Sequence, residues 1–373
     1  MHSVLLLGCG KIGRMITKLL TTTTDYRLVV ADNDVATLER LQSSFPIETR
    51  HLDAARRQDL EAVMAGVDSV VSALSFSFNP LVAQVAREAG ASYFDLTEDV
   101  ATTRAVRRVA EHAKPGQVFM PQCGLAPGFV SIAAHELTRG FDRLDRVFMR
   151  VGALPQFPSN ALKYNLTWST DGLINEYLNP CESIHQGERR DVLPLEGLEH
   201  FSIDGVRYEA FNTSGGLGTL CETLDGRVDE LNYKTIRYQG HRELMAFLIA
   251  GLKLGDRRDL LKDILENAVP VTYQDVVVVF CTVSGLRRGK LEQVTDARKI
   301  YSTEIDGEVW SAIQITTAAG VCAMLDLHRE GQLRSSGFLR QEEVPLGTFL
   351  HNRFGAYYEP RTNAAFSITA EGG

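Results

Sequence analysis

The first third of the chain alternates short apolar runs with amphipathic stretches, and this pattern restricts the possible folds more than any other feature. About five such alternations occur within roughly 120 residues. Apolar runs bounded by turn residues are typical of buried strands, and the stretches between them carry apolar residues at helical spacing. Strands that alternate with helices form a parallel sheet with crossover helices. We therefore expect a doubly wound α/β sheet whose ligand lies at the carboxyl ends of the strands.

The expected elements follow one another closely. Strands are expected at 3–7, 27–32, 48–53, 68–74, 92–96 and 117–121. Helices are expected between them at 12–20, 35–42, 56–66, 80–90 and 101–113. Asp34 is placed to cap the second helix, and Pro80 falls in the first turn of the fourth, where no hydrogen bond is lost.

A glycine-rich turn separates the first strand from the first helix. Gly8, Gly10 and Gly13 let backbone N–H groups approach a phosphate there, and the helix N-terminus adds its partial positive charge. This spacing is weak evidence alone, but its place at the start of a βαβ unit strengthens it. We predict a Rossmann-type dinucleotide-binding domain, with Lys11 and Ile12 also at the cofactor. The alternative is a tight structural turn.

The residue that ends the second strand bears on which dinucleotide is bound. Asp32 follows the glycines at the roughly 20-residue spacing of this fold, where a carboxylate accepts hydrogen bonds from the ribose hydroxyls and repels a 2′-phosphate. The next residues, Asn33 and Asp34, supply no cation. NAD is therefore favoured over NADP. The alternative is a surface aspartate beside a structural turn.

Further cofactor contacts are expected where other strands end. Asp53 follows the third strand and is expected beside the adenine, although an exposed loop carboxylate fits equally well. Ala73 and Leu74 end the fourth strand and are expected to skirt the cofactor, or to form an ordinary strand end. Thr97 follows the fifth strand, at the edge where the nicotinamide ring is expected.

The rhythm changes after residue 126. Strand-like segments and turns replace the regular alternation, which predicts a second, α+β domain with a mostly antiparallel sheet. A late helical stretch, at 316–331, is expected to return to the first domain. We therefore divide the chain into a dinucleotide-binding domain at 1–126, completed by 318–360, and a substrate-binding and dimerisation domain at 127–317.

Composition and motifs disfavour several classes of partner. The net charge of −8 disfavours nucleic acid and anionic membranes, and no apolar stretch approaches the roughly 20 residues that span a bilayer. The six cysteines form no CxxC pair and the histidines no HExxH motif, so neither disulfides nor a metal site is expected. We recognise no signal peptide. The sequence predicts a cytoplasmic protein with a small-molecule ligand.

Four blocks in the later part of the chain carry a resemblance to a known family. They are, in order, GLAPGF, VGALPQFPSNALKYNLTWSTDGLINEY, EAFNTSGGLGTL and ELNYKTIRYQGH. Together they resemble the saccharopine dehydrogenase-like family, and most of all its lysine 6-dehydrogenase branch. The resemblance implies a nicotinamide-dependent oxidoreductase acting on a carbon–nitrogen bond of an amino acid. In that branch the ε-amine is oxidised to an imine, which hydrolyses to a semialdehyde.

The chain also departs from that branch. Cys123 stands where a small residue without a thiol is expected, and Thr213 and Ser214 stand where an acidic residue is expected. These differences bear on the identity of the substrate more than on the type of reaction.

Oxidation of an amine needs a group that orients the nitrogen and manages its protons. Asp95 ends the fifth strand and is the first candidate for this role, with Glu98 a weaker one. The alternative is that Asp95 caps the following turn or pairs with an arginine.

The segment YKTIRYQGH supplies cations and donors for the amino-acid end of a substrate. Strand alternation sends Thr235 and Arg237 to one face, where Arg237 is expected to hold a carboxylate. His241 follows a turn glycine and is a candidate acid, base or hydrogen-bond donor. The alternative is a solvated strand, with Lys234 and Arg237 exposed and His241 capping the next helix.

Three functions are consistent with these features. The leading one is an NAD-dependent amino-acid or amine dehydrogenase of the lysine 6-dehydrogenase type. The second is a saccharopine- or carboxynorspermidine-type reductase that joins an amine to a carbonyl. The third is a dinucleotide-binding sensor without catalysis. We also expect a homodimer, because an open antiparallel sheet buries its exposed face or edge by pairing.

Overall fold

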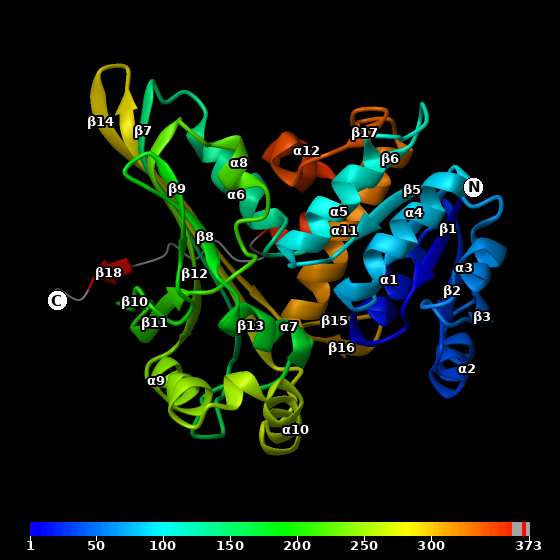
Figure 1. Ribbon diagram of the computed structural model, residues 1–373, viewed down its shortest axis with the longest axis horizontal. Coiled ribbons are helices and arrows are strands. Elements are labelled where there is room, and N and C mark those ends of the chain that lie inside the picture. The colour runs from blue at the N-terminus through cyan, green and yellow to red at the C-terminus, as the bar shows by residue number, and fades with distance from the viewer. Residues whose placement is uncertain (360–367, 371–373) are drawn as a thin grey trace. The chain divides into compact units, whose positions relative to one another are not determined.

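The computed structural model describes residues 1–359 and 368–370, which belong to two compact units (Figure 1). The first unit consists of Met1–Ile132 and Gln314–Tyr357. The second consists of Ala133–Ile313 and the segment that starts at Tyr358. The first unit is therefore built from two separate stretches of sequence. Residue 360, at which the expected return segment ends, lies outside the described residues.

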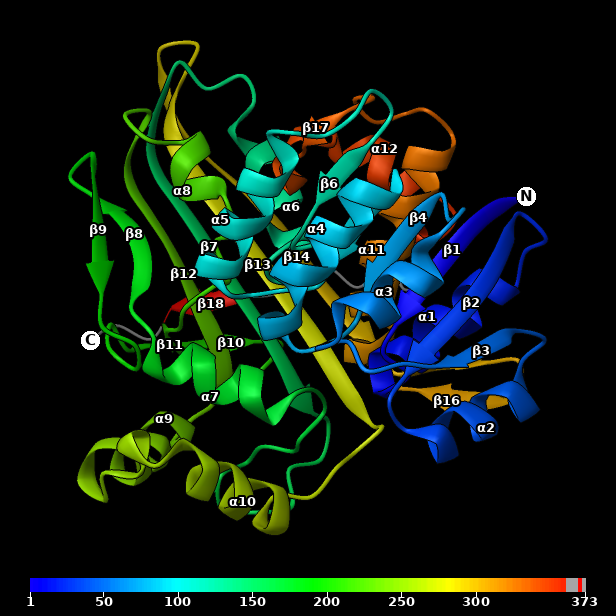
Figure 2. The same ribbon diagram turned by 45° about the vertical axis from the view of Figure 1, so that its right-hand side comes forward.

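The described part of the first unit contains a parallel sheet of seven strands. Their order is β17-β6-β5-β4-β1-β2-β3, and all neighbouring pairs run parallel. The doubly wound α/β fold is thus confirmed, and β1, β2 and β3 can be followed in Figure 2. The strands are β1 (His2–Leu7), β2 (Tyr26–Asp32), β3 (Glu48–His51), β4 (Ser69–Ser72), β5 (Ser92–Asp95), β6 (Val118–Met120) and β17 (Gly337–Phe338).

The first five helices begin and end close to their expected positions. Asp34 accepts a hydrogen bond from the Thr37 N–H at 3.1 Å, which is the expected cap of the second helix. Two later helices, α6 and α11, contain the boundaries between the units. The helices are α1 (Lys11–Thr21), α2 (Val35–Ser44), α3 (Arg57–Met64), α4 (Asn79–Ala89), α5 (Val100–Ala110), α6 (Phe129–Thr138), α11 (Ala312–Arg329) and α12 (Leu346–His351).

The position of β1 in the sheet determines where a ligand is expected. The apolar run Val4–Leu7 is fully buried, as a central parallel strand covered on both faces requires. The chain leaves β1 for β2 on one side and later reaches β4 on the other, so the strand order reverses at β1. In open α/β sheets ligands bind at the carboxyl ends of the strands at such a point. The glycine turn follows β1 at this place.

The second unit is organised around a mixed sheet. Its path is β14-β13-β7-β12-β11-β10-β18; β8 also pairs with β12, and β9 pairs with β8. Among the described strands of this second sheet only β7 and β12 pair in parallel, so the expectation of a mostly antiparallel sheet is confirmed. The strands are β7 (Arg143–Pro155), β8 (Cys181–His185), β9 (Glu188–Val192), β10 (Glu199–Ile203), β11 (Val206–Asn212), β12 (Val228–Tyr238), β13 (Asp275–Arg287), β14 (Lys290–Tyr301) and β18 (Ile368–Ala370), and the short pair β15 (Thr303–Ile305) and β16 (Glu308–Trp310) lies outside this sheet.

Side chains on the two faces of this sheet enter different apolar clusters. One cluster joins Tyr164, Tyr177 and Phe211 to buried residues of the helical segments. The other lies around Tyr208 and Ile236. Residues that alternate along β12 therefore have different surroundings. The helices of this unit are α7 (Thr170–Leu178), α8 (Leu220–Thr223), α9 (His241–Ala246) and α10 (Arg258–Ala268).

The segment 161–169 forms turns, although its residues are strand-like. Lys163 has a φ of 49°, in the left-handed region, and the side-chain amide of Asn160 donates to the Tyr164 carbonyl at 2.6 Å. Leu166 joins Val271 in an isolated bridge. Strand propensity is realised only where a neighbouring strand edge is available, and at this segment local hydrogen bonds close a turn instead.

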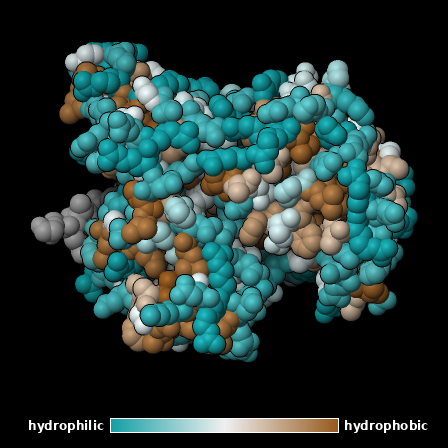
Figure 3. Space-filling model, in the orientation of Figure 1, coloured by the Kyte–Doolittle hydropathy of each residue, from teal (hydrophilic) through white to brown (hydrophobic). Residues whose placement is uncertain are grey.

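The surface of the second unit exposes apolar side chains near α9 and α10. Leu244, Phe247 and Leu252 are each more than one-third exposed, and apolar groups interrupt the hydrophilic surface at the lower left of Figure 3. In the part of the chain that the structure describes, no helix is long and apolar enough to cross a membrane.

Candidate functional site

The physical reason for a glycine differs among the three positions of the turn after β1. A side chain at Gly8 would bring its Cβ to 2.9 Å from the Ala73 carbonyl oxygen, and Gly8 has a φ of +97°. At Gly13 the Cβ would lie only 2.0 Å from the Gly8 carbonyl oxygen. At Gly10 it would meet no atom within 4 Å. The fold therefore explains Gly8 and Gly13, whereas the space beside Gly10 is open.

The N-terminus of α1 faces this open space at Gly10. Gly10 is the N-cap residue and, as a glycine, has no side chain with which to cap the helix. The first turn, which contains exposed Lys11 and half-buried Ile12, holds no acidic residue. A helix N-terminus carries partial positive charge and suits an anion such as a pyrophosphate. The residues present thus fit the phosphate groups of a dinucleotide.

Asp32 is held beside the glycine turn. One oxygen of its carboxylate accepts a hydrogen bond from the Cys9 N–H at 2.7 Å, and the other accepts one from the Asp34 N–H at 3.0 Å. Asp32 is half-buried at the end of β2. This is the position from which an acidic group reaches the ribose in this fold.

The remaining predicted cofactor residues also lie at or just after the carboxyl ends of strands. Asp53 follows β3 and accepts a hydrogen bond from the Ala55 N–H at 3.0 Å. Ala73 and Leu74 follow β4, and the Ala73 N–H donates to the Leu7 carbonyl at 2.8 Å. Thr97 follows β5 and is buried. The structure brings these strand ends to one edge of the sheet, and their contact with a cofactor stays a prediction.

Asp95 ends β5 and is completely buried. It accepts hydrogen bonds from the Tyr93 hydroxyl at 2.8 Å, the Thr97 N–H at 2.9 Å and the Gln122 N–H at 3.0 Å. Burial raises the pKa of Asp95 to about 6, against these three hydrogen bonds, which lower it. The contacts are those of the alternative interpretation, in which Asp95 orders the turn. A pKa near neutrality also suits acid–base chemistry, so the catalytic role stays a prediction.

Cys123 lies next to Asp95. The Cys123 N–H donates to the Asp95 carbonyl at 2.8 Å, and its thiol donates to the Met120 carbonyl at 3.0 Å. The amide of Gln341 approaches the sulfur at 3.1 Å. Burial raises the pKa of the Cys123 thiol well above its usual value. All six cysteines are buried and free of disulfides.

Arg237 of β12 is buried, with 3% of its surface exposed, which excludes the alternative of a solvated strand. Its Nε donates to the Tyr177 hydroxyl at 2.9 Å, and its Nη1 donates to the Thr235 hydroxyl at 2.7 Å and the Ile236 carbonyl at 2.9 Å. The guanidinium carbon lies 4.9 Å from the centre of the Tyr164 ring. No carboxylate of the described residues forms an ion pair with Arg237.

Lys234, on the opposite face of β12, differs from Arg237 because its charge is already paired with a carboxylate. Its ammonium donates to the Glu199 carboxylate at 2.5 Å and to the Gly197 carbonyl at 2.5 Å. Glu199 also accepts two hydrogen bonds from Arg150, at 2.8 and 2.9 Å. One carboxylate thus neutralises part of the charge of two buried cations.

His241 is buried at the start of α9, close to Arg237. Its Nδ1 lies 2.8 Å from the Leu162 carbonyl and its Nε2 lies 3.0 Å from the Tyr177 hydroxyl. Burial, and then the charge of Arg237, lowers the pKa of His241 to about 3. The imidazole is therefore neutral near pH 7, and both of its nitrogens have partners. These contacts leave no ring nitrogen for proton transfer to a substrate.

The sequence interpretation did not single out Tyr177. Its hydroxyl connects Arg237 to His241, and its ring packs against Phe211 with centroids 5.8 Å apart. Tyr177 lies in the block TDGLINEY, which carried part of the family resemblance but has no motif of its own. Its role depends on the packing of α7 on the sheet, which local pattern does not reveal.

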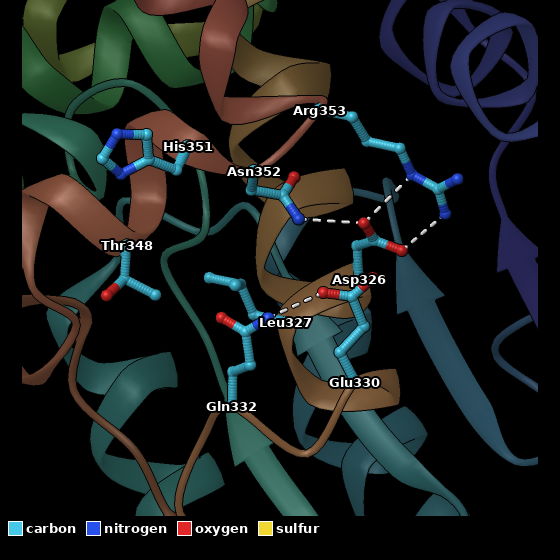
Figure 4. Close-up of a pocket in the computed structure, with 8 residues that line it drawn as sticks. All are labelled: Asp326, Leu327, Glu330, Gln332, Thr348, His351, Asn352 and Arg353. Carbon is cyan, nitrogen blue, oxygen red and sulfur yellow. Dashed lines mark hydrogen bonds and ion pairs between the residues drawn. The ribbon is translucent and has the colours of Figure 1, made fainter.

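A pocket of about 390 Å³ lies elsewhere in the first unit, around Asp326. Figure 4 shows the side chains of Asn352 and Arg353 directed at the Asp326 carboxylate. Asp326 also accepts a hydrogen bond from the Tyr26 hydroxyl at 2.5 Å and ion-pairs with Arg329. None of the predicted site residues lines this pocket. The bonds from Asn352 and Arg353 to Asp326 join the segment after α12 to α11.

Both parts of the chain match models of one protein family. Residues 4–120 match the saccharopine dehydrogenase NADP binding domain, and residues 124–352 match the saccharopine dehydrogenase C-terminal domain. The chain belongs to the saccharopine dehydrogenase family. The family assigned from the four sequence blocks is therefore confirmed.

Relatives within this family are distant in sequence. The chain is 23% identical to saccharopine dehydrogenase [NADP(+), L-glutamate-forming] of Saccharomyces cerevisiae, over 82% of its own length and 69% of that protein. It is 20% identical to the mitochondrial alpha-aminoadipic semialdehyde synthase of Rattus norvegicus, of which it spans 34%. The apo structure of the yeast enzyme matches with a TM-score of 0.80 and 18% identity, over 99% of this chain and 100% of that one. This structural likeness supports the fold.

The buried neutral His241 predicts a specific dependence of stability on acid. Its unfolded-state pKa is about 6.5 and its folded-state pKa is about 3. Below pH 6.5 the unfolded chain binds a proton that the folded chain does not, so stability falls as the pH falls from about 6.5 towards 3. Between about pH 7 and pH 5, His241→Gln should lose roughly 2 kcal/mol less stability than the wild type.

Urea unfolding at the two pH values measures this difference. Asp95 contributes with the opposite sign, because its pKa is raised, but it is present in both proteins and cancels in the comparison. The control is His112→Gln at an exposed position. Equal loss of stability in wild type and His241→Gln would contradict the assignment of a neutral buried imidazole.

Proposed function

We propose that this member of the saccharopine dehydrogenase family is an NAD-dependent oxidoreductase that acts on a carbon–nitrogen bond of an amino acid. The observation that carries the proposal is the presence of both family domains in one chain, the first with an intact glycine turn. When bound, the nicotinamide dinucleotide supplies the hydride acceptor or donor. Gly8, Gly10, Gly13 and Asp32 are the residues that would hold its pyrophosphate and ribose.

Our preference for NAD rests on Asp32, whereas the names of the matched family model and of the yeast relative specify NADP. The matched family model is an NADP binding domain, and the yeast relative is named for NADP. In this chain a carboxylate stands at the end of β2, and Asp34, which follows closely, caps α2. A 2′-phosphate at that position would meet negative charge, whereas free ribose hydroxyls would donate to it.

The second unit supports recognition of a single carboxylate on the substrate. In the described part of this unit, three of the four buried cations already have a carboxylate partner, and Arg237 does not. A substrate with one α-carboxylate, such as lysine, needs one such cation. The four buried cations are Arg150, Lys234, Arg237 and Arg298.

This observation favours oxidative deamination of the lysine 6-dehydrogenase type as the leading activity. Saccharopine carries several carboxylates, whereas Arg237 is the only one of the four described buried cations of this unit without an ion pair. The reductase that joins an amine to a carbonyl remains the second candidate, because the yeast relative is named for saccharopine and L-glutamate. A screen of lysine, saccharopine and polyamines, followed at the absorbance of the reduced cofactor, separates the two activities.

A homodimer also stays a prediction.

Gly10 tests dinucleotide binding without disturbing the fold. Gly10→Ala places a Cβ in the open space, so the free energy of unfolding should change by less than about 1 kcal/mol. Dinucleotide affinity should fall at least about tenfold, because the methyl group would occupy the place of the pyrophosphate. Calorimetric titration measures the affinity, and Gly13→Ala, whose Cβ would meet the Gly8 carbonyl, should instead destabilise the protein. Unchanged dinucleotide affinity in Gly10→Ala would show that the pyrophosphate does not bind beside Gly10.

Asp32 tests the choice of cofactor. The wild type should bind NAD at least about tenfold more tightly than NADP, and Asp32→Asn should narrow this ratio mainly by strengthening NADP binding. Asp53→Asn is the matched control: Asp53 is predicted beside the adenine, which the two cofactors share, so both affinities should change alike. A wild type that prefers NADP would remove Asp32 from this role.

Asp95→Asn tests the acid–base role. Asparagine can accept from the Thr97 and Gln122 N–H groups and donate to the Tyr93 hydroxyl, so the fold and cofactor affinity should survive. Turnover of the amine identified in the screen should fall by about 10² or more. If turnover is unchanged, Asp95 only orders the turn. A wild type that binds NAD yet oxidises no amine would favour the sensor.

A further inference from the structure

The orientation of the Arg237 guanidinium is determined by a chain of hydrogen bonds that ends at a backbone carbonyl. The Leu162 carbonyl can only accept, so Nδ1 of His241 carries the proton and Nε2 has a free lone pair. The Tyr177 hydroxyl therefore donates to Nε2, at 3.0 Å. Its oxygen then accepts from Nε of Arg237, at 2.9 Å. Each bond in this chain fixes the direction of the next.

The remaining donors of Arg237 are unequally used. A guanidinium has five N–H donors. Nε–H is taken by Tyr177, and Nη1 donates to the Thr235 hydroxyl and the Ile236 carbonyl. Among the described residues Nη2 has no hydrogen-bond partner. The N–H groups that are left for a ligand are therefore those of Nη2.

The carboxylate opposite Arg237 is used for another purpose. Glu209 pairs with Arg237 in register across β11 and β12. Its two oxygens instead accept from the N–H groups of Gly240 and Arg242, at 2.9 and 2.6 Å, at the start of α9. Glu209 thereby holds the first turn of α9, in which His241 lies. The anion nearest in register stabilises the positioning group and leaves the arginine without an ion pair.

We propose that Tyr177 and His241 are positioning residues that hold Arg237 so that its Nη2 end binds the α-carboxylate of an amino-acid substrate. This rests on the proposed function, in which Arg237 is the carboxylate anchor. His241 acts as a neutral hydrogen-bond acceptor rather than as an acid or base. Tyr177 is essential to the arrangement because it is the only described residue that bonds to both Arg237 and His241.

The test compares carboxylate binding in variants of this chain. Tyr177→Phe removes the hydroxyl but keeps the ring, so affinity for an α-amino acid should fall about tenfold. Tyr238→Phe is the matched control, since it removes a hydroxyl of β12 that donates to the Pro155 carbonyl. The probes are L-lysine, L-glutamate and 1,5-diaminopentane, titrated by calorimetry into the full chain with cofactor present. Binding of the diamine, which has no carboxylate, should not change in Tyr177→Phe.

Three further variants distinguish a positioning role from a purely structural one. His241→Gln retains an acceptor for the Tyr177 hydroxyl, so its affinity for an α-amino acid should stay close to that of the wild type. His241→Leu has no such acceptor and should lose as much affinity as Tyr177→Phe does. Arg237→Lys measures the loss of amino-acid affinity that is expected when the guanidinium itself is removed. Where an amino acid is turned over, Tyr177→Phe should raise KM about tenfold and change kcat less than about twofold.

The outcomes distinguish failure of this proposal from failure of the proposed function. If the wild type oxidises an amino acid and Tyr177→Phe keeps its KM, the positioning role is wrong and the function stands. If no amine is oxidised but an amino-acid probe binds and Tyr177→Phe weakens it, the positioning role stands without the activity. If neither amino acid binds to the wild type, Arg237 is not a carboxylate anchor and the proposal is overturned.

Discussion

The close approach of α1 to the turn after β1 is the constraint on which the first unit's candidate site depends. At Gly13 there is room for a hydrogen atom but not for a Cβ, which would lie 2.0 Å from the Gly8 carbonyl oxygen. This contact brings the helix N-terminus to the carboxyl end of a buried strand. The open space at Gly10 and the hydrogen bond from the Cys9 N–H to Asp32 lie in the same turn.

A buried guanidinium without a carboxylate partner plays the corresponding part in the second unit. Burial of a charge is costly unless hydrogen bonds or counter-charges compensate for it. At Arg237 the compensation comes from a tyrosine, a threonine and a carbonyl, together with the Tyr164 ring. These hydrogen-bond partners are neutral, and the buried Glu176 carboxylate acts on Arg237 through its charge without forming an ion pair with it. The result is a cation that can still bind an anion, in contrast to Lys234 and its Glu199 partner.

The same physics changes the interpretation of His241. In the sequence His241 is a candidate acid or base, but desolvation and the charge of Arg237 keep this imidazole neutral. Asp95 shows the opposite effect of burial on an acid, whose pKa rises to about 6. Burial is the main cause of both pKa shifts. The hydrogen bonds that join Asp95 to Gln122 and His241 to Leu162, both distant in sequence, act against these shifts.

The sequence by itself determined the features that depend on local geometry. Period and turn residues predicted the strands and helices of the first unit, the glycine spacing predicted the turn after β1, and Asp34 was correctly expected to cap α2. The blocks of the second part identified the family, and strand alternation placed Thr235 and Arg237 on one face.

Only the tertiary structure decided how these residues are paired and buried. It made Arg237 a buried cation without a carboxylate, tied Lys234 to Glu199, linked Tyr177 to His241 and turned 161–169 into a loop. Periodicity and φ preferences act over a few residues, so a sequence shows them directly. Burial and hydrogen-bond partners join residues tens of positions apart, and they exist only once the strands and helices have packed.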